Sequence, residues 1–340
     1  MRAARSRGVR PYGLAIALAI ATLALAACAD ESSSGSSPSG AEPDSSFPVT
    51  IDHKYGATEI SEPPQRVVTV GLTDHDALLA LGIEPVGVTD WYGEQPYAVW
   101  PWAQDELGTA EPEVVGNATE LNFEKIAALD PDVIVGLYSA LTDEDYDTLS
   151  QIAPTVAQPD DVDYGIPWQE LTRTVGRVVG QAGEAEDLVK GLEERFAEVR
   201  ADHPEFEGAS AAIATPFEGI YVYSAEVANG RVLSSFGFQI PDELRELIGT
   251  ADGTNLSLER VDLLDLDLVV WLDGAEGQGP LGTAVYEQLD VHAEGREVLI
   301  DSASDLGGAM SFSSVLSLPL LLDELVPMLA SAVDGDPATN

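Results

Sequence analysis

Two segments of this chain repeat each other, and the repeat limits the possible folds more than any other feature of the sequence. Residues 121–136 (LNFEKIAALDPDVIVG) align without gaps with residues 256–271 (LSLERVDLLDLDLVVW). Each copy has an N-cap residue, Asn122 or Ser257, then a short helical run with a Glu in its first turn, an Asp-containing turn and an apolar strand. The repeat predicts two similar α/β lobes. The alternative is that the two segments are alike only because helix caps and apolar strands recur in many proteins.

Short β-branched runs alternate with helical stretches from residue 47 onward. This alternation predicts α/β layers with mostly parallel strands in the central sheets. The expected strands are residues 66–70, 85–88, 132–136, 211–214, 220–223, 267–271 and 297–300. The expected helices include residues 74–81, 123–129, 241–248 and 313–330.

The middle of the chain has no expected strand. Within residues 184–200 the apolar positions follow helical spacing, at Leu188, Leu192, Phe196 and Val199. A helix of that length is about 26 Å long and can bridge two lobes. A crossover helix within a single sheet is the alternative. The expected organisation is an N-terminal lobe at 47–182, a bridging helix at 183–204 and a C-terminal lobe at 205–340.

The N-terminal region is typical of an exported lipoprotein. Residues 1–27 carry four Arg and no acid, and their apolar run is shorter than the roughly 20 residues that span a bilayer, which indicates a signal peptide. The run ends in LAAC, which resembles a bacterial lipobox, so Cys28 is the expected lipidation site. Residues 28–46 are rich in Ser and lack large apolar side chains, which predicts a flexible tether. We expect the folded part to be anchored to the outer face of the cell membrane through this lipid alone.

The charge and the residue types exclude several functions. The chain has 16 Lys and Arg against 59 Asp and Glu, a formal net charge of -43, and a surface this acidic repels nucleic acid. Cys28 is the only cysteine, no GxSxG nucleophile motif occurs, and the four His are scattered. We therefore expect no enzyme, no catalytic residues, no cofactor and no metal site. An envelope-anchored hydrolase and a purely structural lipoprotein are the alternatives.

Several short motifs resemble those of a known family. They are PQRVV (64–68), LLALGIEPVGV (78–88), FEKI with DPDVI (123–134), IAPTV (152–156), SLERV (257–261) and REVLID (296–301). These motifs resemble the substrate-binding lipoproteins of ABC importers for ferric siderophores, haem and cobalamin. The resemblance implies two α/β lobes joined by one rigid helix, with the ligand bound between the lobes.

The resemblance also implies a protein partner. In that family, one glutamate on each lobe docks onto arginines of the two permease subunits, and the motifs place these residues at Glu124 and Glu259. The alternative is that each Glu only stabilises its own helix dipole, which is worth about 0.3–1 kcal/mol. The expected partner is an ABC permease dimer, and the binding protein is expected to be a monomer.

Ligand-binding residues are expected on loops that follow strand ends and face the cleft between the lobes. Residues 90–102 contain three of the five Trp and are interrupted by Pro96 and Pro101, which predicts an aromatic loop. Packing of these aromatic rings into a small core is the alternative. The expected ligand-binding residues are Thr73, Asp74, His75, Trp91, Tyr92, Tyr138, Tyr223, Arg231, Trp271 and Phe312.

The charges near the expected cleft favour one ligand class. His75 has no companions at metal-ligand spacing, so we expect a polar contact from it rather than metal ligation. Arg231 is the only basic residue expected there, among acids such as Asp90 and Glu94. A highly anionic ferric tris-catecholate would be repelled. The expected ligand is a neutral or cationic ferric hydroxamate siderophore, with haem and cobalamin as alternatives.

Overall fold

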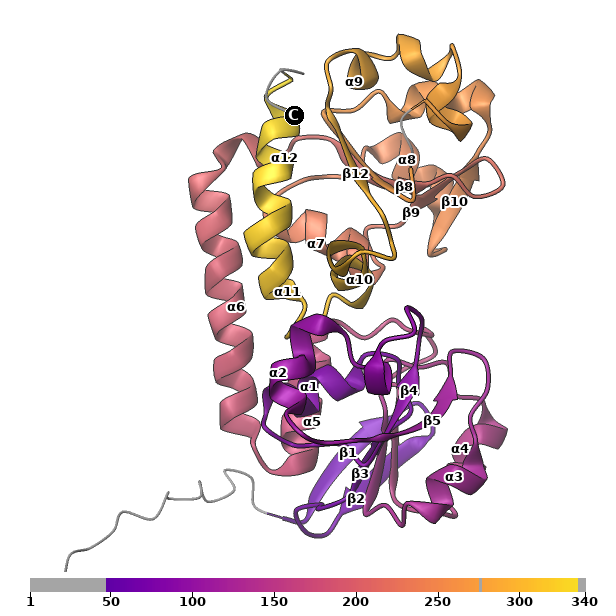
Figure 1. The fold of residues 1–340 in the computed structure, drawn as a ribbon, viewed down its shortest axis with the longest axis vertical. Helices are drawn as coiled ribbons and strands as arrows, with labels where there is room; N and C mark the ends of the chain where they lie inside the picture. Colours follow the sequence, from indigo (N-terminus) through magenta and orange to yellow (C-terminus); the bar gives the residue numbers. More distant parts are fainter. Residues whose placement is uncertain (1–46, 275–276, 336–340) are drawn as a thin grey trace, which may run out of the picture. The chain divides into compact units, whose positions relative to one another are not determined.

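The computed structural model describes residues 47–274 and 277–335, which all lie within one compact unit, Glu42–Asn340. The unit is a mixed α/β fold with two five-stranded sheets and one two-stranded sheet (Figure 1). The fold class predicted from the sequence is confirmed. Among the described helices, none is both long enough and apolar enough to cross a membrane.

The N-terminal sheet is parallel throughout and has the order β5-β4-β3-β6-β7. Every residue of β3 and β6 is buried, as expected for a parallel sheet covered on both faces. The carboxyl ends of all five strands meet at one edge of the sheet. The strands are β3 (Val67–Thr69), β4 (Gly87–Asp90), β5 (Glu113–Asn117), β6 (Val133–Gly136) and β7 (Thr155–Ala157).

The C-terminal sheet has the order β10-β9-β8-β11-β12. Strands β8, β11 and β12 are parallel, whereas β9 runs antiparallel to both of its neighbours. All five residues of β11 are buried, because this strand lies between two others and has both faces covered. The strands are β8 (Ala211–Thr215), β9 (Ile220–Tyr223), β10 (Gly253–Leu256), β11 (Leu268–Leu272) and β12 (Glu297–Ile300).

Five strands were not predicted from the sequence. Two of them, β1 (Val49–His53) and β2 (Gly56–Ile60), form an antiparallel hairpin. The others are β5, β7 and β10, and each is the edge strand of its sheet. Edge strands are short or rich in polar residues, so they lack the continuous apolar run that marks a central strand.

The helices cover the sheets and connect their strands. In the repeated segment, Asn122 caps α3 as predicted, because its side chain accepts a hydrogen bond from the Lys125 N–H. Ser257 precedes a 3₁₀ helix, η4 (Leu258–Leu264), and its hydroxyl makes no cap hydrogen bond. The α-helices are α1 (Asp74–Ala80), α2 (Gln104–Leu107), α3 (Phe123–Ala128), α4 (Asp143–Leu149), α5 (Trp168–Val179), α6 (Ala182–Asp202), α7 (Ala228–Phe236), α8 (Asp242–Ile248), α9 (Asp290–Ala293), α10 (Asp305–Phe312), α11 (Leu318–Leu320) and α12 (Val326–Val333).

Helix α6 connects the N-terminal half, which precedes it, to the C-terminal half, which follows it. Leu192 and Phe196 are buried on its apolar face. They belong to a core cluster that also contains Val135 of the N-terminal sheet and Val270 of the C-terminal sheet. This shared core explains why the two halves group as one compact unit. The expected lobe boundaries at 47–182, 183–204 and 205–340 stay a prediction.

The C-terminal helical region lies beside α6 (Figure 1). An ion pair joins Arg195 of α6 to Asp323 at 2.7 Å between nitrogen and oxygen. The prediction of a continuous helix at 313–330 is wrong for the first residues of that range. Ser313 has a positive φ of 46° and ends α10, and the helix begins again at Leu318.

Candidate functional site

Two cavities are each lined by residues of both halves. The first, which we call the aromatic chamber, has a volume of about 320 Å³. It combines loops that follow strands of the N-terminal sheet with β9 and the start of α7. Its lining residues are Leu72, Trp91, Ala118, Tyr138, Asp163, Tyr164, Tyr221, Tyr223, Val227, Ala228, Asn229, Asp252 and Ser311.

Four tyrosines and Trp91 form much of the wall of the aromatic chamber. Burial raises the pKa of each tyrosine, to about 12 for Tyr138. The phenols are therefore protonated at neutral pH, so the wall offers ring faces and hydroxyl groups rather than phenolate oxygens. Such a surface suits a ligand with apolar faces and polar edges.

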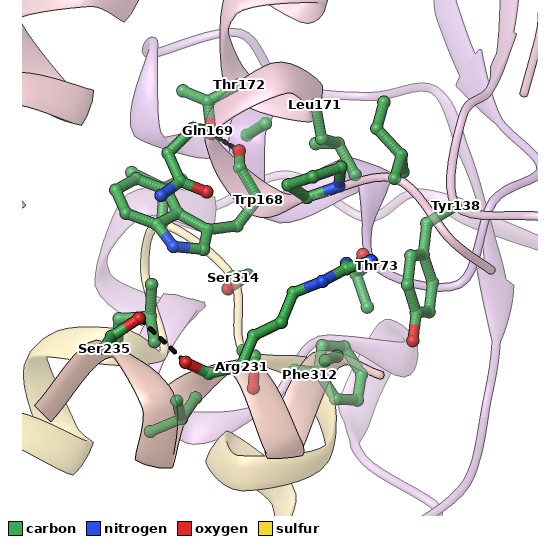
Figure 2. A pocket seen from close by; sticks show the side chains of 18 of the residues that line it. Thr73, Tyr138, Trp168, Gln169, Leu171, Thr172, Arg231, Ser235, Phe312 and Ser314 are labelled. Carbon is green, nitrogen blue, oxygen red and sulfur yellow. Dashed lines mark hydrogen bonds between the residues drawn. The ribbon is translucent and has the colours of Figure 1, made fainter. Parts of the chain in front are cut away.

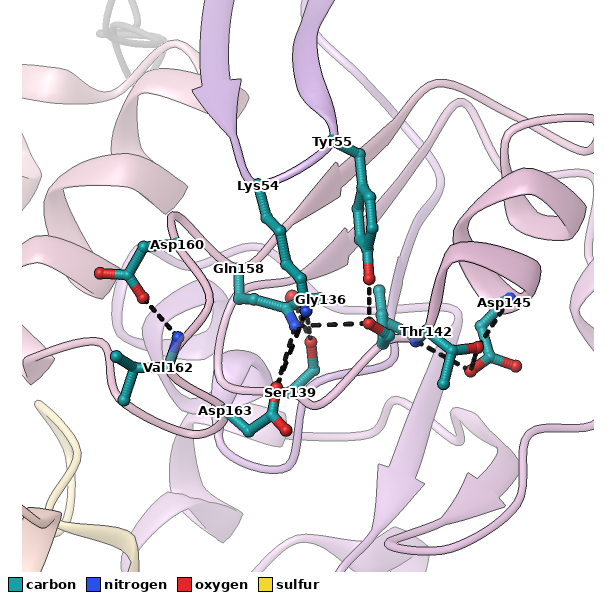
Figure 3. Close-up of polar contacts among 11 residues, drawn as sticks. Lys54, Tyr55, Gly136, Ser139, Thr142, Asp145, Gln158, Asp160, Val162 and Asp163 are labelled. Atoms are coloured by element: carbon teal, nitrogen blue, oxygen red, sulfur yellow. Dashed lines mark hydrogen bonds and ion pairs between the residues drawn. The ribbon is translucent and has the colours of Figure 1, made fainter. Parts of the chain in front are cut away.

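The loop that follows β7 carries Asp163 and Tyr164 into the aromatic chamber. Gln158, at the start of this loop, is fully buried, and Figure 3 shows its side chain hydrogen-bonded to Ser139 and Asp163. Ser139 Oγ donates to Gln158 Oε1 at 3.2 Å, and Gln158 Nε2 donates to Asp163 Oδ1 at 3.4 Å. The Tyr164 N–H also donates to the Ser139 carbonyl at 3.1 Å. These bonds hold the loop against the end of β6 and position the Tyr164 ring.

The second cavity, which we call the hinge chamber, is larger, at about 430 Å³ (Figure 2). Its walls come from α5, α6, α7 and the segment 312–318. The lining residues are Thr73, Ala77, Tyr138, Ile166, Pro167, Trp168, Gln169, Leu171, Thr172, Phe196, Ala225, Glu226, Ala228, Arg231, Val232, Ser234, Ser235, Phe312, Ser313, Ser314, Val315 and Leu318. Tyr138 and Ala228 line both chambers, so the two cavities are neighbours.

Arg231 is the only basic side chain that lines either chamber in the described part of the chain. It extends from α7 toward Thr73 and Tyr138 in Figure 2, and its Nη2 donates to the carbonyl of Gly165 at 2.8 Å. This bond crosses from the C-terminal half to the N-terminal half. The guanidinium has five N–H donors in total, so it is suited to bind ligand oxygens in addition to Gly165.

The aromatic loop after β4 packs around Phe312 of α10. The ring centroid of Phe312 lies 5.2 Å from those of Trp91 and Trp102. Trp100 is 1% exposed and stacks on Trp102, so these two rings form the small core that was the alternative for this loop. Asp76 accepts hydrogen bonds from Trp102 Nε1, at 2.9 Å, and from Ser314 Oγ, and so connects the two halves beneath the loop.

A model of the family described as periplasmic binding protein matches residues 67–289. This range runs from β3 through α6 to the 3₁₀ turn at Tyr286–Gln288, and it includes the lining residues of both chambers except those at 311–318. The chain belongs to the periplasmic binding protein family.

Individual relatives of this periplasmic binding protein agree with that assignment. It is 29% identical over 214 residues to the "Probable siderophore-binding lipoprotein YfiY" of Bacillus subtilis, an alignment that covers 62% of this chain but less than two thirds (63%) of YfiY. A solved periplasmic solute binding protein from Mycobacterium smegmatis is 34% identical, with a TM-score of 0.74 over 84% of this chain and 98% of the other. Streptococcus pneumoniae PiaA in complex with ferrichrome shares the fold, with a TM-score of 0.73 at 24% identity, over 84% of this chain and 99% of PiaA.

Two predicted ligand residues of this binding protein are corrected by the structure. Asp74 is fully buried, and its carboxylate accepts the backbone N–H groups of Leu137 and Tyr138, at 2.7 and 2.9 Å. His75 is also fully buried, beside Phe312, and burial lowers its pKa. Neither residue lines a chamber. The sequence placed them correctly after β3, but α1 begins at Asp74 and turns both side chains inward.

Trp271 is a third correction. It lies within β11, is fully buried, and donates from Nε1 to Tyr286 Oη at 2.9 Å and to Glu297 Oε1 at 3.0 Å. It therefore supports the core of the C-terminal half. The prediction placed it at the end of a strand, but β11 continues to Leu272 with both faces covered.

The structure brings six of the ten predicted ligand residues to the chambers. These are Thr73, Trp91, Tyr138, Tyr223, Arg231 and Phe312. Tyr92 contacts Phe312 and Trp91 but lines neither chamber. Among the described residues, no group of three or more His, Cys, Asp and Glu side chains is placed to hold a metal ion.

Tyr164, Tyr221, Trp168 and Gln169 also line the chambers but were not predicted from the sequence. A signal existed for Tyr221, because it alternates with Tyr223 along β9 and so shares its face of the sheet. Trp168 and Gln169 begin α5, which the sequence marks only as the start of a helical region. Their place in a cavity depends on α7, more than fifty residues further along the chain.

The two predicted docking residues are exposed on different halves of the binding protein. Glu124 lies in the first turn of α3, and Glu259 lies in the first turn of η4. Neither makes an ion pair within the described residues, whereas the adjacent Lys125 and Arg260 do. Cys28, the predicted lipidation site, lies outside the described residues.

Proposed function

We propose that this protein is the extracytoplasmic substrate-binding lipoprotein of an ABC importer and that it captures a ferric siderophore in the aromatic chamber. The observation that carries the proposal is a cavity walled by four protonated tyrosines and Trp91, with one arginine at its boundary. Rigid amphipathic rings contact the apolar faces of a large chelate, and their hydroxyl groups and the guanidinium bind its polar edge. The name of YfiY supports the same ligand class.

The location and partner in this proposal come from the sequence. A lipid on Cys28 would hold the protein at the outer face of the cell membrane, and residues 28–46 would serve as the tether. Glu124 and Glu259 would dock onto the permease dimer. Both lie outside the chambers, so docking and ligand capture use separate surfaces.

Within the siderophores, the chamber charges favour a hydroxamate. Asp163 and Asp252 line the aromatic chamber, and Glu226 lines the hinge chamber. A ferric tris-catecholate carries three negative charges and would meet these carboxylates with only Arg231 to offset them. A ferric tris-hydroxamate is neutral, or cationic when its backbone carries an amine, and avoids this repulsion.

Quenching of tryptophan fluorescence tests the ligand class, because Trp91 lies in the chamber wall. We expect a ferric hydroxamate to bind at least tenfold more tightly than a ferric tris-catecholate when both are titrated into the purified protein. The same titration with haem and cobalamin tests the two alternatives within the family. A preference for the catecholate would overturn the hydroxamate proposal, and turnover of an ester, peptide or glycoside by the purified protein would favour the hydrolase.

Arg231→Ala tests the role of the arginine. A hydrogen bond to a charged group contributes about 1.5–3 kcal/mol, so we expect a loss of affinity for the ferric hydroxamate of about 10- to 100-fold. Arg231→Lys keeps the charge but not the planar fork, and we expect it to recover part of this loss. Arg173→Ala is the matched control, because Arg173 forms an ion pair with Glu186 away from both chambers. Equal affinities for the Arg231→Ala and Arg173→Ala proteins would rule out the role.

A further inference from the structure

The hinge chamber is the larger of the two cavities, and its walls are mainly hydrocarbon. Leu171 of α5, Phe196 of α6, Val232 of α7 and Leu318 of α11 line it and are all buried. These side chains come from four helices that meet where α6 connects the two halves (Figures 1 and 2). The proposed capture of a chelate by the aromatic chamber leaves this second cavity without a role.

Three of the hydroxyl groups that line the hinge chamber are already bonded to backbone carbonyls. Thr172 Oγ1 donates to the Trp168 carbonyl at 2.7 Å, Ser235 Oγ donates to the Arg231 carbonyl at 2.8 Å, and Ser313 Oγ donates to the Met310 carbonyl at 2.7 Å. Their hydrogens are therefore directed toward the backbone. A polar ligand group placed against these three hydroxyl groups or against the apolar walls would lose hydrogen bonds to water without replacing them.

The boundary between the two chambers is formed by few residues and carries polar groups. Tyr138 and Ala228 line both chambers, and Arg231 reaches across beside Tyr138 to the carbonyl of Gly165. Within the described residues this is the only hydrogen bond of the guanidinium, so further N–H donors are available at the boundary. A ligand that passes from one chamber to the other would have a carbonyl or amide group opposite these donors.

We propose that the two chambers form one bipartite site, in which the aromatic chamber holds the ferric chelate and the hinge chamber holds an uncharged aliphatic arm of the same ligand. Arg231 binds the polar link between chelate and arm. This inference rests on the proposed function and narrows it to chelates that carry a linear acyl or alkyl chain. A compact cyclic chelate fills only the aromatic chamber and leaves the apolar walls of the hinge chamber in contact with water.

The arm is uncharged because of the charges near the cavity. Glu226 lines the hinge chamber and is exposed, so a carboxylate at the end of the arm would be repelled there. Arg231 is the only cation of the chamber within the described residues, and its position at the boundary with the aromatic chamber favours a contact with the link rather than with the far end of the arm. A hydrocarbon arm, in contrast, gains binding free energy from each methylene group that it buries.

A pair of ferric chelates that differ only in the arm tests this inference. Ferrioxamine B is acylated on its terminal amine with an acetyl group in one ligand and with an octanoyl group in the other, which makes both neutral. Isothermal titration calorimetry on the purified protein measures the two dissociation constants. We expect the octanoyl chelate to bind at least tenfold more tightly than the acetyl chelate. A ratio within threefold would overturn the bipartite site while leaving the proposed function intact.

Two variants identify where the arm binds. Ser235→Trp fills the hinge chamber from α7, and Gln169→Trp fills it from α5, on the opposite wall in Figure 2. In either folded variant, as judged by its melting temperature, we expect the preference for the octanoyl chelate to fall to threefold or less. A tenfold preference that persists in both variants would show that the arm binds elsewhere and would overturn the inference. If no ferric chelate of either class bound the wild-type protein, the proposed function would fail and this inference with it.

Discussion

Replacing both Glu124 and Glu259 by alanine is expected to reduce uptake of the ferric chelate at least tenfold in cells that produce this protein. Uptake should fall to near the level of cells without the protein. Both carboxylates are exposed, lie on different halves and make no ion pair within the described residues, so each is free to meet a basic group of the permease. In the proposed docking, the double substitution removes two charge-assisted contacts and so weakens the complex between binding protein and permease. Uptake of radioactive ferric hydroxamate measures the effect.

The matched control for this double variant is Glu106→Ala with Glu287→Ala. These glutamates are also exposed, lie in short helical turns, and occupy the N-terminal and C-terminal halves respectively. The control removes the same net charge, so we expect normal uptake from it. Ligand affinity of the purified protein should stay within twofold for both double variants. Normal uptake by the Glu124→Ala and Glu259→Ala protein, with unchanged ligand affinity, would contradict docking through these residues.

Asp74→Ala is expected to lower the free energy of unfolding by about 3–5 kcal/mol, since each buried donor left without an acceptor costs about 1–3 kcal/mol. The substitution removes the acceptor of the Leu137 and Tyr138 N–H groups, at the end of β6. Chemical denaturation measures the change. The control is Asp143→Ala, which removes an exposed Asp from the first turn of α4 and should change stability by about 0.5 kcal/mol or less.

Asp74 also gives a pH dependence with a definite sign. Burial raises its pKa to about 6, from 3.8 in the unfolded chain. The folded state therefore binds this proton more tightly, so the group costs stability as the pH rises from about 4 to about 6. The permanently neutral Asp74→Asn protein lacks this cost, so its stability relative to the wild type should rise by about 3 kcal/mol over that range. A constant difference between the two proteins would contradict the raised pKa.

The stability result also separates two roles for Asp74. A residue that only binds ligand would leave the unfolding free energy unchanged when it is replaced. The structure predicts the opposite, a less stable protein that keeps its affinity for the proposed ferric hydroxamate ligand at a temperature where it remains folded. Tyr138 lines both chambers, so a modest loss of affinity through its displaced backbone is consistent with the structural role.

The sequence by itself determined the α/β class, the central strands and the regions of helices α1, α3, α6 and α8. These features depend on short-range patterns: apolar β-branched runs for β3, β6, β8 and β11, helical spacing for α6, and the Asn122 cap of α3. The edge strands β5, β7 and β10 escaped prediction because their pairing is decided by a neighbouring strand rather than by their own composition. The family motifs placed Glu124 and Glu259 in the first turn of a short helix, but the structure forms a capped α-helix in one copy and a 3₁₀ helix without a side-chain cap in the other.

Only the tertiary structure decided which side chains line the two chambers. Asp74, His75 and Trp271 have residue types suited to a site, but the packing of α1 and β11 turns them into the core. Arg231 meets the Gly165 carbonyl across 66 residues of sequence, and the hinge chamber exists only where α5, α6 and α7 converge. No local pattern encodes such contacts, because they follow from how separate helices and sheets pack to bury their apolar faces.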